Sequence, residues 1–296
     1  MTTIAVIAHQ KKTLGGGLNE LRRELADRGF KNPIWYEASS SRKSPKLVRQ
    51  AMADGADLLF IWGGDGTVQR SVDAVAGKPV TLAILPAGTA NLLANNLGVP
   101  IDLQGALDVG LNGARRRLDV GVVNGKRFAV MAGVGFDAVM MANADGQLKD
   151  RFGRLAYVWT GIRASHMKSR KVKINVDGKP WFKGKASCIL LGQMGTLARG
   201  VVAFPAARPD DGLLEIGVVT ADNALQWARV FSRLVVGDAE RSPLAQMTQG
   251  REVDIRLKRP TVYELDGGAR SAQKRLRVTI EPGAISVCVP HPDKGE

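Results

Sequence analysis

The sequence predicts an α/β fold, in which a three-layer nucleotide-binding α/β domain precedes a mainly antiparallel β-sandwich domain. In the first 120 residues, short apolar strand-like runs alternate with helical patterns, which is typical of a parallel sheet covered on both faces. From about Arg117 onward short β-like runs dominate instead, and the pairs Asn124-Gly125 and Asp177-Gly178 indicate tight hairpins. The change of pattern near residue 120 therefore predicts two domains.

The first half is expected to contain strands and helices in strict alternation. The predicted strands are TIAVIA (3–8), PIWYEAS (33–39), DLLFIW (57–62) and VTLAIL (80–85). The predicted helices are 18–28, 45–53, one from the GGDGT turn to residue 76 and one from the PAGT turn to residue 97. Gly29, Gly55 and Gly98 are the corresponding stop signals.

The second half is expected to consist of strands interrupted by two helices. The strand-like runs are LDVGVVN, KRFAVMAGVGF, KVKINVDG, ASCILLG, LLEIGVVT, VDIRLK, LRVTIE and AISVCVP, and the helical stretches are 152–167 and 223–236. The predicted domains are therefore residues 1–120 and 121–284. Residues 285–296 are a candidate to return to the first domain.

Composition indicates a soluble enzyme-like chain with an anionic partner. The 296 residues are 45% hydrophobic, and the formal net charge is +14. Such a charge favours nucleic acid, an acidic membrane surface or a phosphorylated ligand. The only two cysteines, Cys188 and Cys288, lie in apolar runs and are expected to be buried free thiols. No signal peptide and no apolar run of about 18 residues is recognised, so cytoplasmic residence is expected.

The turn GGDGT at residues 63–67 follows a buried strand and precedes a helix. Glycines let backbone approach a ligand closely, and N–H groups at a helix start suit phosphate. Asp65 would repel a bare phosphate, so it indicates either a nearby Mg²⁺ or a proton acceptor, and hence phosphoryl transfer. The alternative is a plain Asp-Gly turn in which Asp65 caps the helix.

A second turn repeats this arrangement. LPAGTAN at residues 85–91 again places Gly-Thr between a strand and a helix. Turns at the ends of neighbouring parallel strands face one crevice, where ligands of such sheets bind. The hydroxyls of Thr67 and Thr89 are therefore both candidates to reach phosphate oxygens.

Together, GGDGT (63–67) and LPAGTAN (85–91) resemble the diacylglycerol kinase catalytic-domain family, which includes bacterial lipid kinases and sphingosine and ceramide kinases. The resemblance extends through the chain in GVGFDA (133–138), FGRLAYVWTGIRA (152–164), RPDDGLLEI (208–216) and LDGG (265–268). It implies transfer of the γ-phosphate of ATP, with Mg²⁺, to a lipid hydroxyl. The nucleotide-binding residues that it implies are Gly63, Gly64, Asp65, Gly66, Thr67, Gly88, Thr89 and Asn91. Arg70 is a further candidate, because it adds positive charge near this turn. Its metal site maps to Asp211, with the backbone carbonyls of Arg208 and Leu213.

The sequence departs from the family pattern where catalysis matters. The first strand ends in AHQKK in place of Asn-Pro-x-Ser-Gly, Val-Asn-Glu is replaced by Val68-Gln69-Arg70, and Leu92 replaces an acid. The Glu of the family's Asp-Gly-Glu, taken as its proton acceptor, is Gly268 here. Asp65 is the first substitute candidate, Asp266 the second and Asp137 the third.

The implied function is an ATP- and Mg²⁺-dependent lipid kinase, cytoplasmic and peripherally associated with an anionic membrane surface. Its acceptor would be the primary hydroxyl of ceramide or diacylglycerol, and the missing acid slightly favours a sphingolipid. The basic stretch from Lys149 to Lys185 and the amphipathic helix at 223–236 fit a membrane contact. For that helix, packing on the sandwich with a solvated basic face is the alternative.

The rival functions are a catalytically weak or inactive lipid- and nucleotide-binding regulator, and an NAD kinase. Nucleic acid is not expected as a partner, and the sequence does not indicate an oligomeric state.

Overall fold

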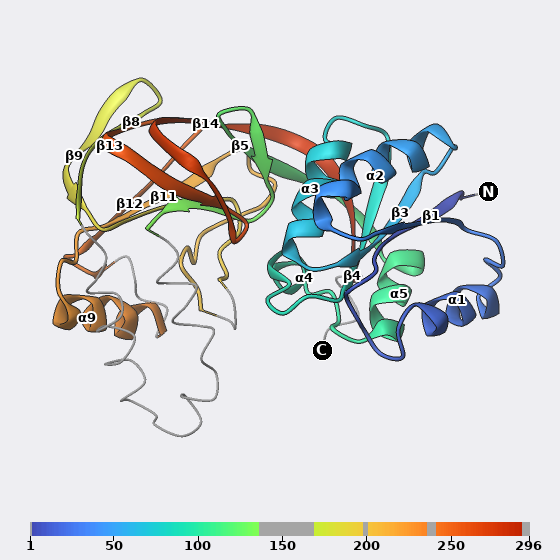
Figure 1. Cartoon of the computed structure of the whole chain (residues 1–296). Coiled ribbons are helices and arrows are strands. Elements are labelled where there is room, and N and C mark those ends of the chain that lie inside the picture. Colours follow the sequence, from blue (N-terminus) through green and yellow to red (C-terminus); the bar gives the residue numbers. More distant parts are fainter. Residues whose placement is uncertain (1, 136–168, 198–200, 236–240, 292–296) are drawn as a thin grey trace. The chain divides into compact units, whose positions relative to one another are not determined.

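The computed structural model describes residues 2–135, 169–197, 201–235 and 241–291, and it divides into two compact units (Figure 1). The first unit comprises Met1–Val120 and Pro282–Glu296, and the second comprises Gly121–Glu281. Two strands, β5 (Ala114–Val123) and β14 (Gly268–Val289), contribute residues to both units. The expected α/β fold followed by a β-rich domain is confirmed.

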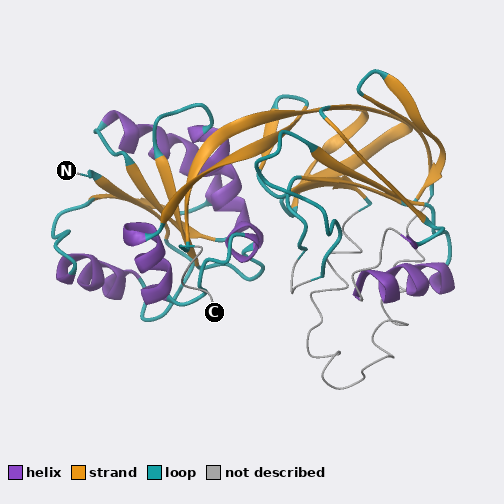
Figure 2. Cartoon of the chain, turned by 180° about the vertical axis from the view of Figure 1, so that it is seen from behind, coloured by secondary structure: helices purple, strands orange, loops and turns teal. Residues whose placement is uncertain are grey.

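The first unit is built on a sheet in the order β4-β3-β1-β2, and the end of β14 pairs with β4 at the sheet edge. All these pairs are parallel, as the continuously apolar strands predict. The strands are β1 (Ile4–His9), β2 (Ile34–Ala38), β3 (Leu58–Gly63) and β4 (Thr81–Pro86). The helices are α1 (Leu18–Asp27), α2 (Ser44–Ala53), α3 (Asp65–Val75), α4 (Leu92–Asn96) and α5 (Leu103–Asn112), with a 3₁₀ turn η1 (Ser41–Lys43). Figure 2 shows helices on both faces of these strands.

Helix α5 is the element of this unit that the sequence pattern did not predict. Its two glycines, Gly105 and Gly110, lower helix propensity and hide the helical period. Tertiary packing explains Gly110, because a Cβ there would lie 2.2 Å from Cε1 of Phe60 on β3. Asp102 caps the helix by accepting a hydrogen bond from the Gly105 N–H at 2.8 Å.

The second unit is mainly antiparallel, in the order β12-β11-β10-β7-β13-β14, with β8 and β9 attached through β13. Its further strands are β6 (Lys126–Phe128), β7 (Met131–Val134), β8 (Arg170–Val176), β9 (Lys179–Ala186), β10 (Cys188–Gly192), β11 (Leu214–Val219), β12 (Ala245–Gly250) and β13 (Glu252–Leu265). Both predicted hairpins form: β5 pairs with β6 around Asn124-Gly125, and β8 pairs with β9 around Asp177-Gly178. All four turn residues have positive φ, as this type of two-residue turn requires.

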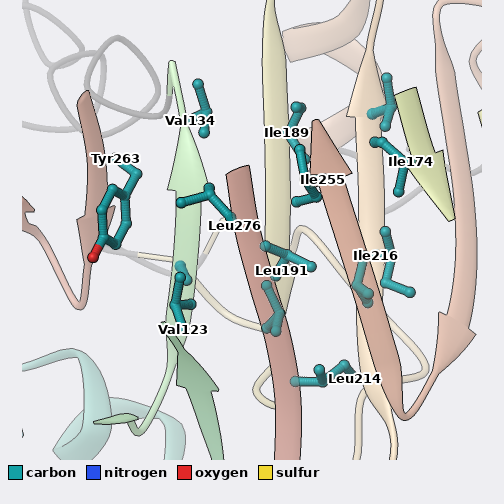
Figure 3. Packing of buried hydrophobic residues seen from close by; sticks show 14 of the residues in the cluster. Val123, Val134, Ile174, Ile189, Leu191, Leu214, Ile216, Ile255, Tyr263 and Leu276 are labelled. Carbon is teal, nitrogen blue, oxygen red and sulfur yellow. The ribbon is translucent and has the colours of Figure 1, made fainter. Parts of the chain in front are cut away.

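The core of the second unit forms where inward-facing aliphatic residues of several strands meet, as Figure 3 shows. Ile174, Ile216 and Ile255, from three different strands, are fully buried. The sequence runs LRVTIE and AISVCVP, expected as two strands, are instead parts of the single 22-residue strand β14.

Helix α9 (Ala224–Val235) buries its apolar face. Trp227, Val230 and Phe231 are at most 6% exposed, whereas Leu225 is 64% exposed and Arg229 points to solvent. This favours the packed-helix alternative over an apolar face that is free to enter a membrane. Among the residues that the structure describes, no helix is long and apolar enough to cross a membrane. The predicted helix at 152–167 lies outside the described residues.

Candidate active site

The GGDGT turn forms the junction between β3 and α3. Gly63 ends the strand, Gly64 is the N-cap residue of the helix and Asp65 is its first residue. A Cβ on Gly63 would lie 2.6 Å from Cβ of Thr67, so the turn has no room for a side chain at this position. The Thr67 and Val68 N–H groups both donate to the Gly64 carbonyl, at 2.8 and 3.1 Å, and the N–H groups before them lie at the positive end of the helix dipole.

The turn after β4 packs directly against this first turn. A Cβ on Gly88 would lie 2.5 Å from Cα of Gly64, and the Ala87 N–H donates to the Gly63 carbonyl at 3.0 Å. The two backbones therefore touch at the carboxyl edge of the sheet. The expectation that the two Gly-Thr turns face the same crevice agrees with this contact.

Asp65 joins the two turns. Its carboxylate accepts hydrogen bonds from the N–H groups of Asn91, at 3.1 Å, and Leu92, at 2.5 Å, which are the N-cap and first residue of α4. The sequence alternative had Asp65 as a cap of its own helix, whereas the structure makes it a cap of the neighbouring helix. Burial raises the pKa of Asp65, while these backbone hydrogen bonds and the nearby Lys12 ammonium partly oppose that rise.

Asn91 shapes the second turn from within. Its backbone is left-handed, with φ 48°. Its Oδ1 accepts from the Gly88 N–H at 2.9 Å, and its Nδ2 donates to the carbonyls of Pro86 and Gly88 at 3.1 and 3.0 Å. These bonds engage both Nδ2 protons and one of the two lone pairs of Oδ1. They favour a role for Asn91 in positioning the turn over direct contact with a nucleotide.

The remaining predicted nucleotide residues differ in accessibility. Thr67 is only 3% exposed, so its hydroxyl is not presented to solvent in this structure. Thr89 and Gly66 are exposed, and Gly64 and Arg70 are half-buried. Of the two threonines, Thr89 therefore retains an accessible hydroxyl for a phosphate oxygen. These accessible groups, beside glycines that must remain without side chains, fit a nucleotide phosphate chain.

Two basic segments that sequence reasoning did not assign to the site also lie at this edge. Lys12 follows β1, and its carbonyl accepts a hydrogen bond from Nε1 of Trp62 at 2.9 Å, which holds it beside β3. Ser41 begins η1, and its Oγ would lie 3.7 Å from a Cβ on Gly66. The sequence signal was the AHQKK departure at the end of the first strand, which places cations where the sheet order reverses between β1 and β3.

Asp266, the second candidate base, lies in the second unit and has a structural role. It is 5% exposed, and its carboxylate accepts from the N–H groups of Ala129, Val130 and Met131 at 2.8 to 2.9 Å. Its own N–H donates to the Met131 carbonyl. A carboxylate that is buried and bonded in this way stabilises the β7 segment. The structure therefore does not support Asp266 as the proton acceptor.

The side chain of Arg270 lies beside Gly268, the residue that replaces the family's Glu. A Cβ on Gly268 would lie 2.8 Å from Nη1 of Arg270. That Nη1 donates to the carbonyls of Gly268 and Ala269 at 2.9 and 3.1 Å. The side chain of Arg270 thus fills the space into which a longer residue at 268 would project.

The predicted metal residues form an exposed turn in the second unit. The Oδ1 of Asp211 accepts from the Leu213 N–H at 3.0 Å, and Asp211 and Arg208 are exposed. Within the described part of the chain, no three His, Cys, Asp or Glu residues are close enough to hold a metal together. Mg²⁺ is often bound by one carboxylate with carbonyls and waters, so this donor set fits Mg²⁺ as a partial site. Asp137, the third candidate base, lies outside the described residues.

Two protein-family models match successive parts of the chain. Residues 5–123 match the diacylglycerol kinase catalytic domain, and residues 129–289 match the YegS C-terminal NAD kinase beta sandwich-like domain. Among solved structures, a diacylglycerol kinase from Bacillus anthracis aligns with TM-score 0.75 at 20% identity, over 97% of this chain and 96% of that one. An NAD kinase from Archaeoglobus fulgidus in complex with ATP aligns with TM-score 0.54 at 11% identity, over 96% and 93%. At these identities the two structures establish the fold alone.

Curated relatives are closer in sequence. A "Probable lipid kinase YegS-like" of Pseudomonas fluorescens is 33% identical over 260 residues, covering 87% of this chain and 84% of that protein. A "Diacylglycerol kinase" of Staphylococcus aureus is 28% identical over 261 residues, covering 85% and 82%. The chain therefore belongs to the diacylglycerol kinase catalytic-domain family, a family of lipid kinases, and it carries the YegS-type second domain.

Proposed function

We propose that this chain transfers the γ-phosphate of ATP, with Mg²⁺, to the primary hydroxyl of a two-chain lipid, either diacylglycerol or ceramide. The observation that carries the proposal is the pair of glycine turns fastened together by Asp65. The names of the relatives, a probable lipid kinase and a diacylglycerol kinase, support a lipid acceptor. We further propose a cytoplasmic protein that associates peripherally with membranes.

In this proposal the first unit binds the nucleotide phosphates. The N-terminus of α3 supplies backbone N–H groups and a positive dipole end. Thr89 adds an accessible hydroxyl, and Lys12 adds positive charge beside the turn. Bound Mg²⁺ would neutralise charge on the phosphates. In the second unit, Asp211 with the carbonyls of Arg208 and Leu213 is a separate proposed Mg²⁺ site.

Asp65 is the proposed proton acceptor. A carboxylate has about four lone-pair sites, and two N–H groups of α4 use part of that capacity. The raised pKa of Asp65 moves it toward the working range of a general base. Asp65 can therefore hold the two turns together and still accept a proton from the lipid hydroxyl.

Gly268 supports one alternative, a catalytically weak member that binds lipid and nucleotide as a regulator. A protein of this kind would bind ATP normally without phosphorylating any lipid. The NAD kinase alternative has fold-level likeness alone as its support.

The deciding experiment measures transfer of labelled γ-phosphate to micellar diacylglycerol, ceramide, sphingoid base and phosphatidylglycerol, with NAD as a further acceptor. Asp65→Asn is expected to lose about 10²- to 10⁴-fold in kcat, as for removal of a general base. Asp27→Asn, at an exposed position at the end of α1, is the matched control and should retain full activity. Titration with ATP runs in parallel. Bound ATP without label in any lipid would contradict the kinase proposal and favour the regulator, whereas label in NAD alone would make the chain an NAD kinase.

A further inference from the structure

The outer face of the second unit carries a continuous set of cations across four neighbouring strands. Strand register places Lys183, Lys173, Arg256 and Arg275 in one row across β9, β8, β13 and β14. Lys171 is directly opposite Lys185 in the next row, and Lys258 follows two positions after Arg256 on the same face. We call these seven residues the basic face: Lys171, Lys173, Lys183, Lys185, Arg256, Lys258 and Arg275.

Exposed and buried side chains alternate along these strands, so the basic face and the core lie on opposite sides of the sheet. Val172, Ile174, Ile255 and Leu257 point inward and are at most 6% exposed, whereas the residues of the basic face are all exposed. A shallow groove of about 600 Å³ is lined by six of these cations, all except Arg275, together with Val172, Gly184 and Leu257. Protein packing therefore does not require these side chains to be basic.

Like charges directly opposite each other on neighbouring strands destabilise a sheet. Within the described residues, the ion pairs on this face are those of Asp254 with Arg256, at 2.9 Å, and with Arg275, at 2.6 Å. Glu252, the next acid on the same side of β13, lies beyond Asp254 and away from the groove. Seven cations around one paired aspartate leave an excess of positive charge, which a polyanionic partner would offset.

We infer that the basic face docks on an anionic membrane surface. This inference rests on the proposed function, since a lipid kinase must reach an acceptor that resides in a bilayer. Five of the seven residues are lysines, spaced across strands that are about 4.8 Å apart, which matches a planar array of headgroup charges more closely than one defined ligand. Single-stranded nucleic acid is disfavoured because it needs aromatic stacking, and the nearby Trp181 and Phe182 pack against the core.

The test is flotation of the full-length protein with vesicles of phosphatidylcholine alone or mixed with phosphatidylglycerol. The variant Lys171→Gln, Lys173→Gln, Lys183→Gln, Lys185→Gln removes four charges from the basic face. The matched control removes four exposed lysines elsewhere, with Lys31→Gln, Lys46→Gln, Lys78→Gln and Lys126→Gln, for the same change in net charge. Thermal melts confirm that both variants are folded.

We expect the wild type to float only with anionic vesicles, and added salt to weaken this binding. A basic residue near an anionic surface contributes about fivefold, so the face variant should partition at least tenfold more weakly, while the control should change by about twofold at most. Equal losses in both variants would overturn the inference, because net charge alone would then explain the binding. Unchanged binding by the face variant, or binding of duplex DNA but not vesicles through this face, would overturn it as well.

Kinase activity toward a lipid in neutral detergent micelles separates this inference from the proposed function. Loss of vesicle binding by the face variant, with micellar turnover comparable to the wild type, supports both. If neither the wild type nor either variant phosphorylates lipid, but vesicle binding still depends on the basic face, the kinase proposal is contradicted and the docking inference is supported.

Discussion

Two Asp-Gly turns, one in each unit, are alike in sequence and differ in their surroundings. Asp65 begins a helix at the edge of the parallel sheet, is half-buried and joins two turns that each present one exposed residue, Gly66 and Thr89. Asp266 lies between β13 and β14, is 5% exposed and accepts three backbone hydrogen bonds. An aspartate next to glycine can therefore either position a ligand site, as proposed for Asp65, or stabilise a core segment, as Asp266 does. Accessibility and hydrogen-bond partners separate the two roles.

The largest expected effect is on the contact between the two turns of the first unit. In Gly88→Ala, the new Cβ would lie 2.5 Å from Cα of Gly64 and 2.6 Å from Oδ1 of Asn91, so both turns must move apart. Displacement of about 1 Å in an active site can cost about 100-fold, and we expect kcat/KM for ATP to fall by at least that factor.

Gly66→Ala is a control for stability alone, because Gly66 belongs to the candidate nucleotide site. Its Cβ would meet only Ser41, with Oγ at 3.7 Å, and its backbone does not require glycine. Its melting temperature should match the wild type. A Gly88→Ala enzyme with wild-type ATP binding would show that the contact between the turns is dispensable.

Asp266→Ala tests the structural role of Asp266 through the stability of the second unit. It leaves three buried N–H donors without their acceptor, at about 1 to 3 kcal/mol each when a buried partner is lost. We expect the free energy of unfolding of the second unit to fall by about 3 kcal/mol or more, and amide exchange of Ala129, Val130 and Met131 to accelerate.

Asp65→Ala is the counterpart, and its cost to stability should be about 1 to 2 kcal/mol, as for loss of a helix cap. Asp266→Ala with unchanged amide exchange and lost turnover would reverse the assignment of the two aspartates.

The pH dependence of turnover tests Asp65 itself. Its folded pKa is raised above the ordinary value, so the carboxylate is protonated, and unable to accept a proton, over a wider acid range. We expect kcat/KM to rise as pH increases through that raised pKa. This fall in activity at low pH, the acid limb of the profile, should be absent from the residual activity of Asp65→Asn. The free energy of unfolding should change in the opposite direction to activity. Because the folded state holds this proton more tightly, Asp65 lowers the stability as pH rises from the pKa of the unfolded chain to the raised pKa of the folded protein. An unchanged acid limb in Asp65→Asn would assign it to another group.

The smallest expected effect comes from restoring the family acid. In Gly268→Glu the new side chain meets the flexible end of Arg270, which can swing aside, so the fold should be kept. If Asp65 accepts the proton, kcat should stay within about twofold of the wild type, since a second base contributes little once one is in place. A rise of tenfold or more would show that catalysis was limited at residue 268.

Much of the fold could be predicted because strands and turns here are locally encoded. Apolar runs of strand length, stop glycines and the pairs Asn124-Gly125 and Asp177-Gly178 each specify a conformation from a few neighbouring residues. Helix α5 was missed because its two glycines hide the helical period, and one of them, Gly110, is explained only by its contact with Phe60 on β3. Strand β9 was missed because its sequence, KPWFKGKA, contains three lysines, a proline and a glycine and matches no apolar strand pattern.

The candidate site divides in the same way. The sequence alone shows that two Gly-Thr turns follow consecutive predicted strands, that Asp65 lies within the first of them and that Gly268 stands where the family has Glu. Only the tertiary structure decided that Asp65 caps the helix of the other turn, that Asn91 is engaged within its own turn and that Asp266 is buried. The physical reason is that a motif fixes local backbone geometry, whereas burial and hydrogen-bond partners depend on segments distant in the sequence. Ala129 and Asp266, for example, are 137 positions apart in the sequence, yet the Ala129 N–H donates to the Asp266 carboxylate at 2.8 Å.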